Sequence, residues 1–123
     1  MDEKYHVIST LVEDKPGVLQ KVAGMFNRRG FNIDGITVGS SEVEGLSRMV
    51  ITVHADEKGL EQVMKQLNKL IDVIKIKDIT QKAVKRELCL VKVNIPDVKA
   101  RAEIMQYTNI FRAHILDVTE ESI

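Results

Sequence analysis

The residues with the clearest chemical potential are Glu13–Leu19, where an extended apolar run gives way to an amphipathic helical pattern. Pro16 has no N–H and a φ preset near the helical value, so it suits the first turn of a helix. Gly17 has no Cβ and lets another backbone or a ligand approach closely. The amides of Gly17, Val18 and Leu19 then fall in a first turn, where N–H groups lack intrahelical partners and the dipole favours an anion.

A ligand with both a carboxylate and an ammonium group fits this segment. The carboxylate would dock on the free amides, and Asp14 beside them would pair with the ammonium group, which suits a free amino acid. The alternative is a strand-to-helix turn that binds no ligand. The local sequence favours neither interpretation over the other.

No other residues have the spacing of a chemical site. His6, His54 and His114 have no ligand partners at metal-like spacing, which favours structural or surface roles. Ser47 and the carboxylates show no nucleophile or acid–base motif. Cys89 is the single cysteine and lies in an apolar run, so we expect a core residue in a reducing compartment. We therefore predict no catalytic residue, no metal and no cofactor.

Composition excludes several classes of protein. The 123 residues contain 18 Lys plus Arg and 18 Asp plus Glu, so no net field attracts nucleic acid or an acidic membrane. Aromatic residues make up 4% of the chain, too few for a base-stacking platform. No run approaches the roughly 18 apolar residues of a membrane span, and the charged N-terminus is unlike a signal peptide. We expect a soluble cytoplasmic protein.

The first 79 residues have the pattern β-α-β-β-α-β. Leu19, Val22, Ala23 and Phe26 follow the spacing of one helix face, and Gly30 occupies a typical stop position. The predicted strands span about 5–12, 32–38, 46–54 and 73–79, and the predicted helices span about 16–29 and 57–70.

This order predicts a split β-α-β plan, in which two helices cover one face of a four-stranded antiparallel sheet. In the third strand Met49, Ile51 and Val53 alternate with more polar residues, and Asp56 is placed to cap the second helix. The open face of the sheet carries apolar side chains from several strands, so we expect another sheet or subunit to cover it.

The rest of the chain repeats part of this plan. A charged segment at 81–87 is expected to be a linker, followed by a strand at 88–95, a helix at 98–107 and a strand at 111–118. The expected organisation is a domain over 1–80, a linker over 81–87 and a partial domain over 88–123. A βαβ segment is only half of a second split β-α-β unit, and a sheet this small buries its two faces poorly by itself.

The first region resembles an ACT domain, a ligand-binding module of amino-acid metabolic enzymes, through its element order and the segment Asp14–Leu19. More narrowly, the chain resembles the small regulatory subunits of acetolactate synthase. The segments that carry this resemblance are Phe26–Ile33, Leu46–Met49, Gln66–Val73, Glu87–Val93 and Ile110–Thr119. The implied fold is α+β: a ferredoxin-like ACT domain (βαββαβ) followed by an incomplete second βαβ unit.

The resemblance implies regulation without catalysis. Such proteins bind the thiamine-diphosphate-dependent large subunit, raise its activity, and confer feedback inhibition by valine or another branched-chain amino acid in valine, leucine and isoleucine biosynthesis. Their ACT domains pair side by side into an eight-stranded sheet with the effector at the interface. This chain is expected to form that homodimer and to bind valine or a related amino acid.

Carried over to this sequence, the effector site consists of the turn in one subunit and strand two of its neighbour. Its residues are Asp14, Gly17, Val18 and Leu19 with Asn32 and Ile33 from across the interface. Several family members have Asn at the position of Asp14, where a carboxylate favours the ammonium group but repels the effector's carboxylate. Family members also usually continue past Ile123.

Other classes of function stay open at this stage. A different ACT protein, acting as a stand-alone sensor or a transcriptional co-regulator, would share the turn but not the segment Leu46–Met49. A small enzyme or a nucleic-acid binder could use the same sheet, since fold alone does not fix function. An acylphosphatase-like enzyme would need an arginine in the loop that carries Lys15 and Pro16.

Overall fold

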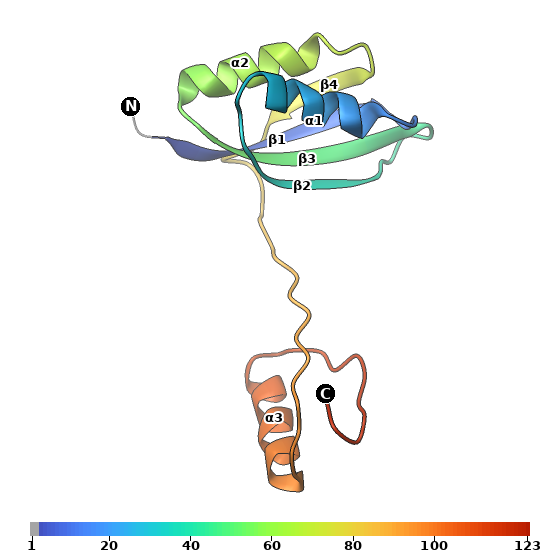
Figure 1. Ribbon diagram of the computed structural model, residues 1–123, viewed down its shortest axis with the longest axis vertical. Helices are drawn as coiled ribbons and strands as arrows, with labels where there is room; N and C mark the ends of the chain where they lie inside the picture. The colour runs from blue at the N-terminus through green and yellow to red at the C-terminus, as the bar shows by residue number, and fades with distance from the viewer. Residues whose placement is uncertain (1–2) are drawn as a thin grey trace. The chain divides into compact units, whose positions relative to one another are not determined.

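The computed structural model describes residues 3–123 as two compact units, one ending at Val84 and one spanning Lys85–Ile123. The first unit has the order β1, α1, β2, β3, α2, β4 (Figure 1). These elements are β1 Lys4–Glu13, α1 Val18–Arg28, β2 Ile33–Ser40, β3 Leu46–Ala55, α2 Glu57–Asn68 and β4 Val73–Asp78. The predicted β-α-β-β-α-β order is confirmed, with every end within two residues of its predicted position.

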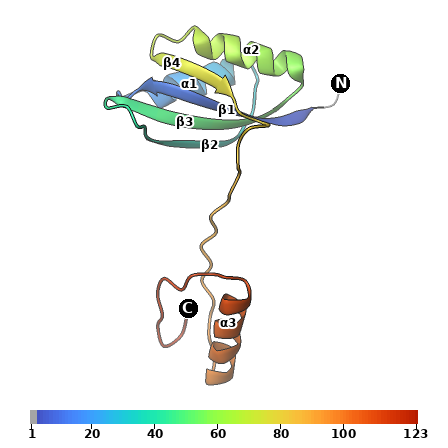
Figure 2. The ribbon, with the colours of Figure 1, turned by 180° about the vertical axis from the view of Figure 1, so that it is seen from behind.

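The four strands form one antiparallel sheet in the order β2-β3-β1-β4. Ile51 of β3 lies opposite both Ile8 of β1 and Ile36 of β2, which fixes the register across three strands. β2 and β4 are the two edge strands, with β4 next to β1 (Figure 2).

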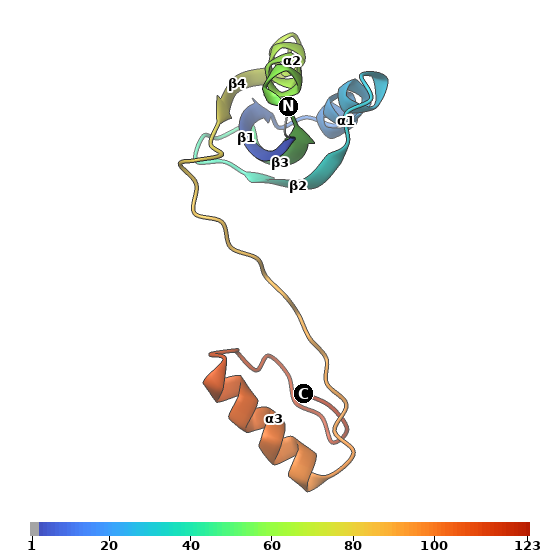
Figure 3. The ribbon, with the colours of Figure 1, turned by 90° about the vertical axis from the view of Figure 1, so that its left-hand side faces the viewer.

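Both helices of this unit cover the same face of the sheet, as the end-on view shows (Figure 3). Alternate residues of the central strands point into the core beneath them, and their neighbours point to the open face. The predicted alternation of β3 is therefore confirmed. The central core residues from the strands are Ile8, Val12, Met49, Ile51 and Val53.

The apolar stripe of α1 is rotated relative to the prediction. The buried residues are Val18, Val22, Met25 and Phe26, whereas Leu19 is 47% exposed. The sequence contains two overlapping stripes at helical spacing, and the one that begins at Val18 rather than the one that begins at Leu19 faces the sheet. Two residues of the predicted α1 stripe, Leu19 and Ala23, therefore lie on the surface.

The ends of the helices match their predicted signals. Asp56 caps α2 by accepting a hydrogen bond from the Gly59 N–H at 2.7 Å. Gly30 follows α1 with a φ of 71°, the left-handed conformation that glycine adopts without strain.

The open face of the sheet carries Tyr5, Val7, Leu11 and Val50, as predicted for an apolar surface. Its centre is partly screened by polar neighbours, because Arg48 Nη1 donates to Ser9 Oγ at 3.0 Å. Tyr5 is the most exposed of the apolar residues, at 60%. A second sheet or subunit over this face stays a prediction.

The second unit contains α3, Val98–Ile110, capped by Asp97 through the Ala100 N–H at 2.7 Å. The predicted helix at 98–107 is confirmed and extends three residues further. The predicted strands at 88–95 and 111–118 are wrong: neither forms, and only an isolated bridge joins Asn94 to Ser122.

The backbone pairing of the first of these segments is confined to its end. The Val93 N–H donates to the Ile123 carbonyl at 2.8 Å, and the Ile95 N–H donates to the Glu121 carbonyl at 2.7 Å. An apolar run becomes a strand only when another strand satisfies its N–H and C=O groups. Cys89 is consequently exposed rather than buried in a core, which corrects the prediction for that residue.

Candidate functional site

The turn that joins β1 to α1 is built around Gly17. Its φ of 85° and ψ of −7° lie in the left-handed region, which L side chains rarely adopt. A Cβ added at Gly17 would meet no atom of this chain within 4 Å. The requirement for glycine inside one subunit is therefore the positive φ rather than close packing, and the space beside Gly17 is open.

The first turn of α1 presents unpaired amides, as the sequence indicated. The N-cap Gly17 has no side chain to cap the helix, and within residues 3–123 no acceptor contacts the N–H of Gly17, Leu19 or Gln20. The Val18 N–H is used, because it donates to the Lys15 carbonyl at 3.4 Å, and the Val18 side chain is buried. Free N–H groups at a helix start favour an anion. The candidate donors are therefore Gly17 and Leu19 rather than all three predicted amides.

Two loops distant in sequence hold this turn. The Glu13 N–H donates to the Asp72 carbonyl at 2.8 Å, and the Asp14 N–H donates to the Gly45 carbonyl at 3.0 Å. Lys21 Nζ in α1 donates to Asp72 Oδ2 at 2.7 Å. Asp72 and Lys21 were not predicted, since no local pattern signals a pair separated by 51 positions.

The charged groups around the turn are already paired. Lys15 Nζ lies 2.6 Å from Glu13 Oε2, and this hydrogen bond raises the pKa of Lys15. The hydrogen bond from Lys21 holds the pKa of Asp72 below its ordinary value. Asp14 is exposed and makes no side-chain hydrogen bond with residues 3–123. An incoming carboxylate would therefore meet backbone amides rather than a free lysine, and Asp14 is available to an ammonium group.

Asn32 and Ile33 lie at the opposite end of the sheet from this turn. Ile33 begins β2 and pairs with Val53, whereas the turn adjoins the hairpin that carries Gly45. At roughly 3.3 Å per residue, the eight residues of β2 separate its ends by about 23 Å. One chain thus brings Asp14, Gly17, Val18 and Leu19 together and does not bring Asn32 and Ile33 to them.

β2 is an edge strand with few of the features that block pairing. Its sequence contains no lysine and no proline, and the charged Asp34 and a shift in register between Ile33 and Gly35 lie at its first residues. Ile36 and Val38 lie on the helix-covered face opposite Ile51 and Met49, yet they are 37% and 48% exposed. The apolar side chains on the helix-covered face therefore extend as far as β2, where they are exposed to solvent.

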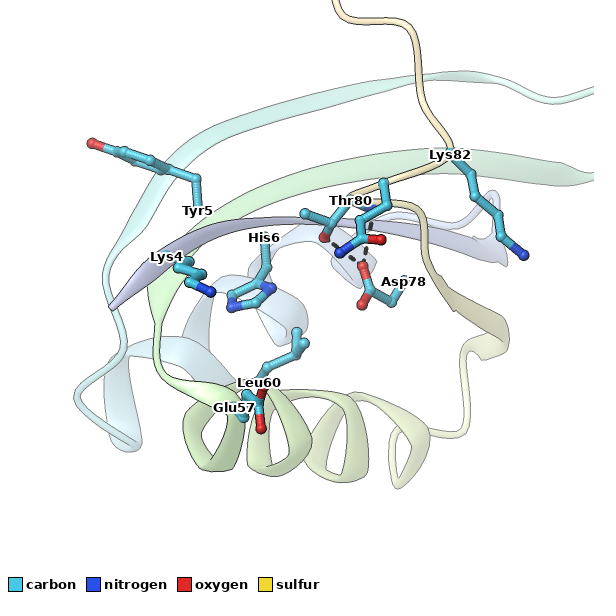
Figure 4. A pocket seen from close by; sticks show the side chains of 9 residues that line it. Lys4, Tyr5, His6, Glu57, Leu60, Asp78, Thr80 and Lys82 are labelled. Carbon is cyan, nitrogen blue, oxygen red and sulfur yellow. Dashed lines mark hydrogen bonds between the residues drawn. The ribbon is translucent and has the colours of Figure 1, made fainter. Parts of the chain in front are cut away.

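A cavity of about 660 Å³ lies at the far end of β1 from the turn (Figure 4). The Thr80 hydroxyl there donates to Asp78 and accepts from the Val7 N–H, so its one proton is already used in a structural hydrogen bond. Burial raises the pKa of Asp78, but the hydrogen bonds from Thr80 outweigh it and the net pKa lies below the ordinary value. The lining residues are Lys4, Tyr5, His6, Glu57, Leu60, Asp78, Thr80, Gln81 and Lys82.

The histidines of the first unit have structural contacts. His6 Nε2 is hydrogen-bonded to the Ala55 carbonyl at 3.1 Å, and His54 lies against Tyr5 with ring centroids 4.7 Å apart. Within residues 3–123, no three His, Cys, Asp or Glu side chains are grouped to hold a metal ion.

Comparison with known proteins decides the family. Residues 8–75 match the model of the AHAS small subunit-like ACT domain, and residues 86–123 match the model of the small subunit of acetolactate synthase. The probable acetolactate synthase small subunit of Methanothermobacter thermautotrophicus is 59% identical over 124 residues, covering 100% of this chain and 74% of its relative. The chain belongs to the acetolactate synthase small-subunit family.

Two further members of the small-subunit family extend this comparison. The acetolactate synthase small subunit of Mycobacterium bovis is 50% identical over 124 residues, covering 100% of this chain and 73% of the relative. The crystal structure of the Thermotoga maritima small subunit is 44% identical, with a TM-score of 0.81 over 97% of this chain and 74% of that one. The ACT fold expected from the resemblance is confirmed. Among residues 3–123, no helix is both long and apolar enough to cross a membrane.

Proposed function

We propose that this chain is a non-catalytic regulatory subunit that binds the thiamine-diphosphate-dependent large subunit of acetolactate synthase. It raises the activity of the large subunit and makes it sensitive to valine or another branched-chain amino acid. The observation that carries the proposal is the first turn of α1, where the N–H groups of Gly17 and Leu19 have no acceptor in a chain of the small-subunit family.

The proposed effector binds through its two charged groups. Its carboxylate accepts hydrogen bonds from the Gly17 and Leu19 amides at the positive end of the helix dipole. Its ammonium group lies near Asp14, and Val18 holds the turn against the core. Asn32 offers an amide that both donates and accepts, while Ile33 supplies apolar contact for the branched side chain.

A homodimer completes this site. If two β2 edges pair antiparallel about a two-fold axis, the start of β2 in one subunit lies beside the end of β2 in the other. That end carries the hairpin with Gly45, which is hydrogen-bonded to Asp14. Asn32 and Ile33 of one subunit would then reach the turn of its partner. The exposed Ile36 and Val38 support this pairing, because it would bury them.

The remaining parts of the proposal concern the whole chain. The ACT domain spans 1–80, a linker spans 81–87, and the region 88–123 contributes to contact with the large subunit. The boundary between the two compact units, after Val84, lies inside the proposed linker. The chain acts in the cytoplasm in valine, leucine and isoleucine biosynthesis, and it needs no cofactor of its own.

Titration calorimetry tests the proposal directly. Valine, leucine and isoleucine are titrated into the full chain, with alanine as a control that has the same charged groups without the branched side chain. We expect saturable binding of at least one branched-chain amino acid and much weaker binding of alanine. Absence of binding by all three branched-chain amino acids would remove the effector part of the proposal.

A further inference from the structure

Asp72 contacts both elements that flank the candidate effector turn. It lies in the connection between α2 and β4, and its side chain is only 13% exposed. Its backbone carbonyl accepts the Glu13 N–H at 2.8 Å, at the end of β1. Its carboxylate accepts Lys21 Nζ at 2.7 Å, from the first turns of α1. One residue therefore connects the end of the strand to the start of the helix.

The start of α1 has little local support of its own. Gly17 provides no side-chain cap, and its left-handed backbone gives the chain more freedom than a capping Ser or Asp would. The first backbone hydrogen bond of the helix runs from the Lys21 N–H to the Gly17 carbonyl at 3.0 Å. Lys21 is thus bonded to Gly17 through its backbone and to Asp72 through its side chain.

We infer that Lys21 and Asp72 are a positioning pair for the effector site: their ion pair fixes the first turn of α1 against the end of β1. The Gly17 and Leu19 amides then keep the alignment that a carboxylate needs, although neither Lys21 nor Asp72 touches the effector. This inference rests on the proposed effector site. It also extends that site to the α2–β4 connection.

The chemistry of the pair supports a positioning role rather than a ligand role. The Asp72 carboxylate is largely buried and satisfied by Lys21, so it is not free to bind an ammonium group. Lys21 is 61% exposed, but its ammonium group is directed to Asp72 and not to the open space beside Gly17. A site held by such supporting contacts loses affinity when they are removed, even if its own residues are intact.

The test compares effector affinity with local opening of the turn. The variants are Lys21→Met, Asp72→Asn, their combination, and Lys21→Arg as the conservative change. Lys65→Met is the matched control, because it removes the 3.0 Å ion pair of Lys65 with Glu61 on α2. Valine affinity is measured by calorimetry on the full chain, and exchange of the Asp14 and Lys21 amides is measured by NMR without valine.

We expect each single removal to weaken valine binding about three- to tenfold and to speed exchange of both amides at least about threefold. The double variant should be no weaker than the weaker single variant, since both remove the same contact. Lys21→Arg should stay within about twofold of the wild type, and Lys65→Met should change nothing.

Wild-type affinity in both single variants would overturn the inference, whatever their exchange rates. Wild-type exchange rates in both would overturn it as well. If the unmodified chain binds no branched-chain amino acid, the proposed function fails by itself. In that case exchange alone decides whether Lys21 and Asp72 hold the turn.

Discussion

Gly17 and Ile33 lie at opposite ends of the sheet in one chain. Gly17 follows β1 at the end where the Asp14 N–H contacts Gly45, whereas Ile33 opens β2 at the end where it pairs with Val53. An effector that contacts both residues must therefore lie between two subunits. The proposed regulation by a small amino acid therefore requires a dimer that forms through β2.

The β2 edge gives the first prediction. Val38→Lys introduces a charge on an exposed apolar position of this edge, where a second copy would have to desolvate it. We expect the variant to be monomeric in sedimentation experiments and to bind valine at least about tenfold more weakly.

The other edge strand offers a matched control. Ile74 of β4 is 53% exposed, close to the 48% of Val38, so Ile74→Lys makes the same chemical change at the opposite edge. This control should remain dimeric and bind valine normally. A dimer that survives Val38→Lys, or one that dissociates only with Ile74→Lys, would contradict pairing through β2.

Gly17→Asp should abolish the response to valine. The new carboxylate would occupy the open space beside the free amides and repel the carboxylate of the effector. Gly17→Ala separates backbone strain from charge: its Cβ meets no atom within 4 Å, but the φ of 85° destabilises the fold by about 1–2 kcal/mol. Calorimetry and urea unfolding of both variants check this, and normal valine binding by Gly17→Asp would exclude the anion site.

Asn32→Ala should weaken valine binding about ten- to a hundredfold, since one hydrogen bond to a charged group contributes about 1.5–3 kcal/mol. The fold and the dimer should be unaffected, because the Asn32 side chain is exposed in the single chain. Asn68→Ala, at an exposed position at the end of α2, is the control for loss of an amide. Unchanged valine affinity in Asn32→Ala would remove Asn32 from the site.

Asp72 predicts a pH dependence of stability. Its pKa is lowered from 3.8 in the folded chain, first by the hydrogen bond from Lys21, with Glu13 and Lys15 as the other charged neighbours. The unfolded chain therefore binds the proton more readily, so the stabilisation is complete above the ordinary pKa and is lost as the pH falls through the folded value. Urea unfolding should show a gap in stability between wild type and Asp72→Asn at about pH 6 that narrows at about pH 3. A gap independent of pH would contradict this.

The sequence was sufficient to predict the first unit and the location of its turn. Hydrophobic periodicity identified both helices and all four strands, because the spacing of apolar residues in each segment fits either a helix or a strand. The exposed positions of Leu19 and Ala23 differ from the prediction, because α1 contains two overlapping apolar stripes and the one that begins at Val18 packs against the sheet. The Lys21–Asp72 pair was also missed, because long-range contacts leave no local signal.

The second unit shows the opposite case. Residues 88–95 have the composition of a strand, yet only Val93 and Ile95 among them make backbone hydrogen bonds within the described residues, and Cys89 is exposed. Composition predicts which segments favour a strand, but pairing decides whether the strand forms. Helix α3 was predictable because its backbone hydrogen bonds are internal.

Reconstitution with the large subunit of acetolactate synthase tests the central claim most directly. Activity is measured for the large subunit alone, with this chain, and with this chain plus valine, leucine or isoleucine. The proposed function predicts that the chain raises the activity of the large subunit. At least one branched-chain amino acid should then lower the activity of the complex. The Gly17→Asp variant should lack the second effect. A large subunit whose activity is the same in all three conditions would contradict the account.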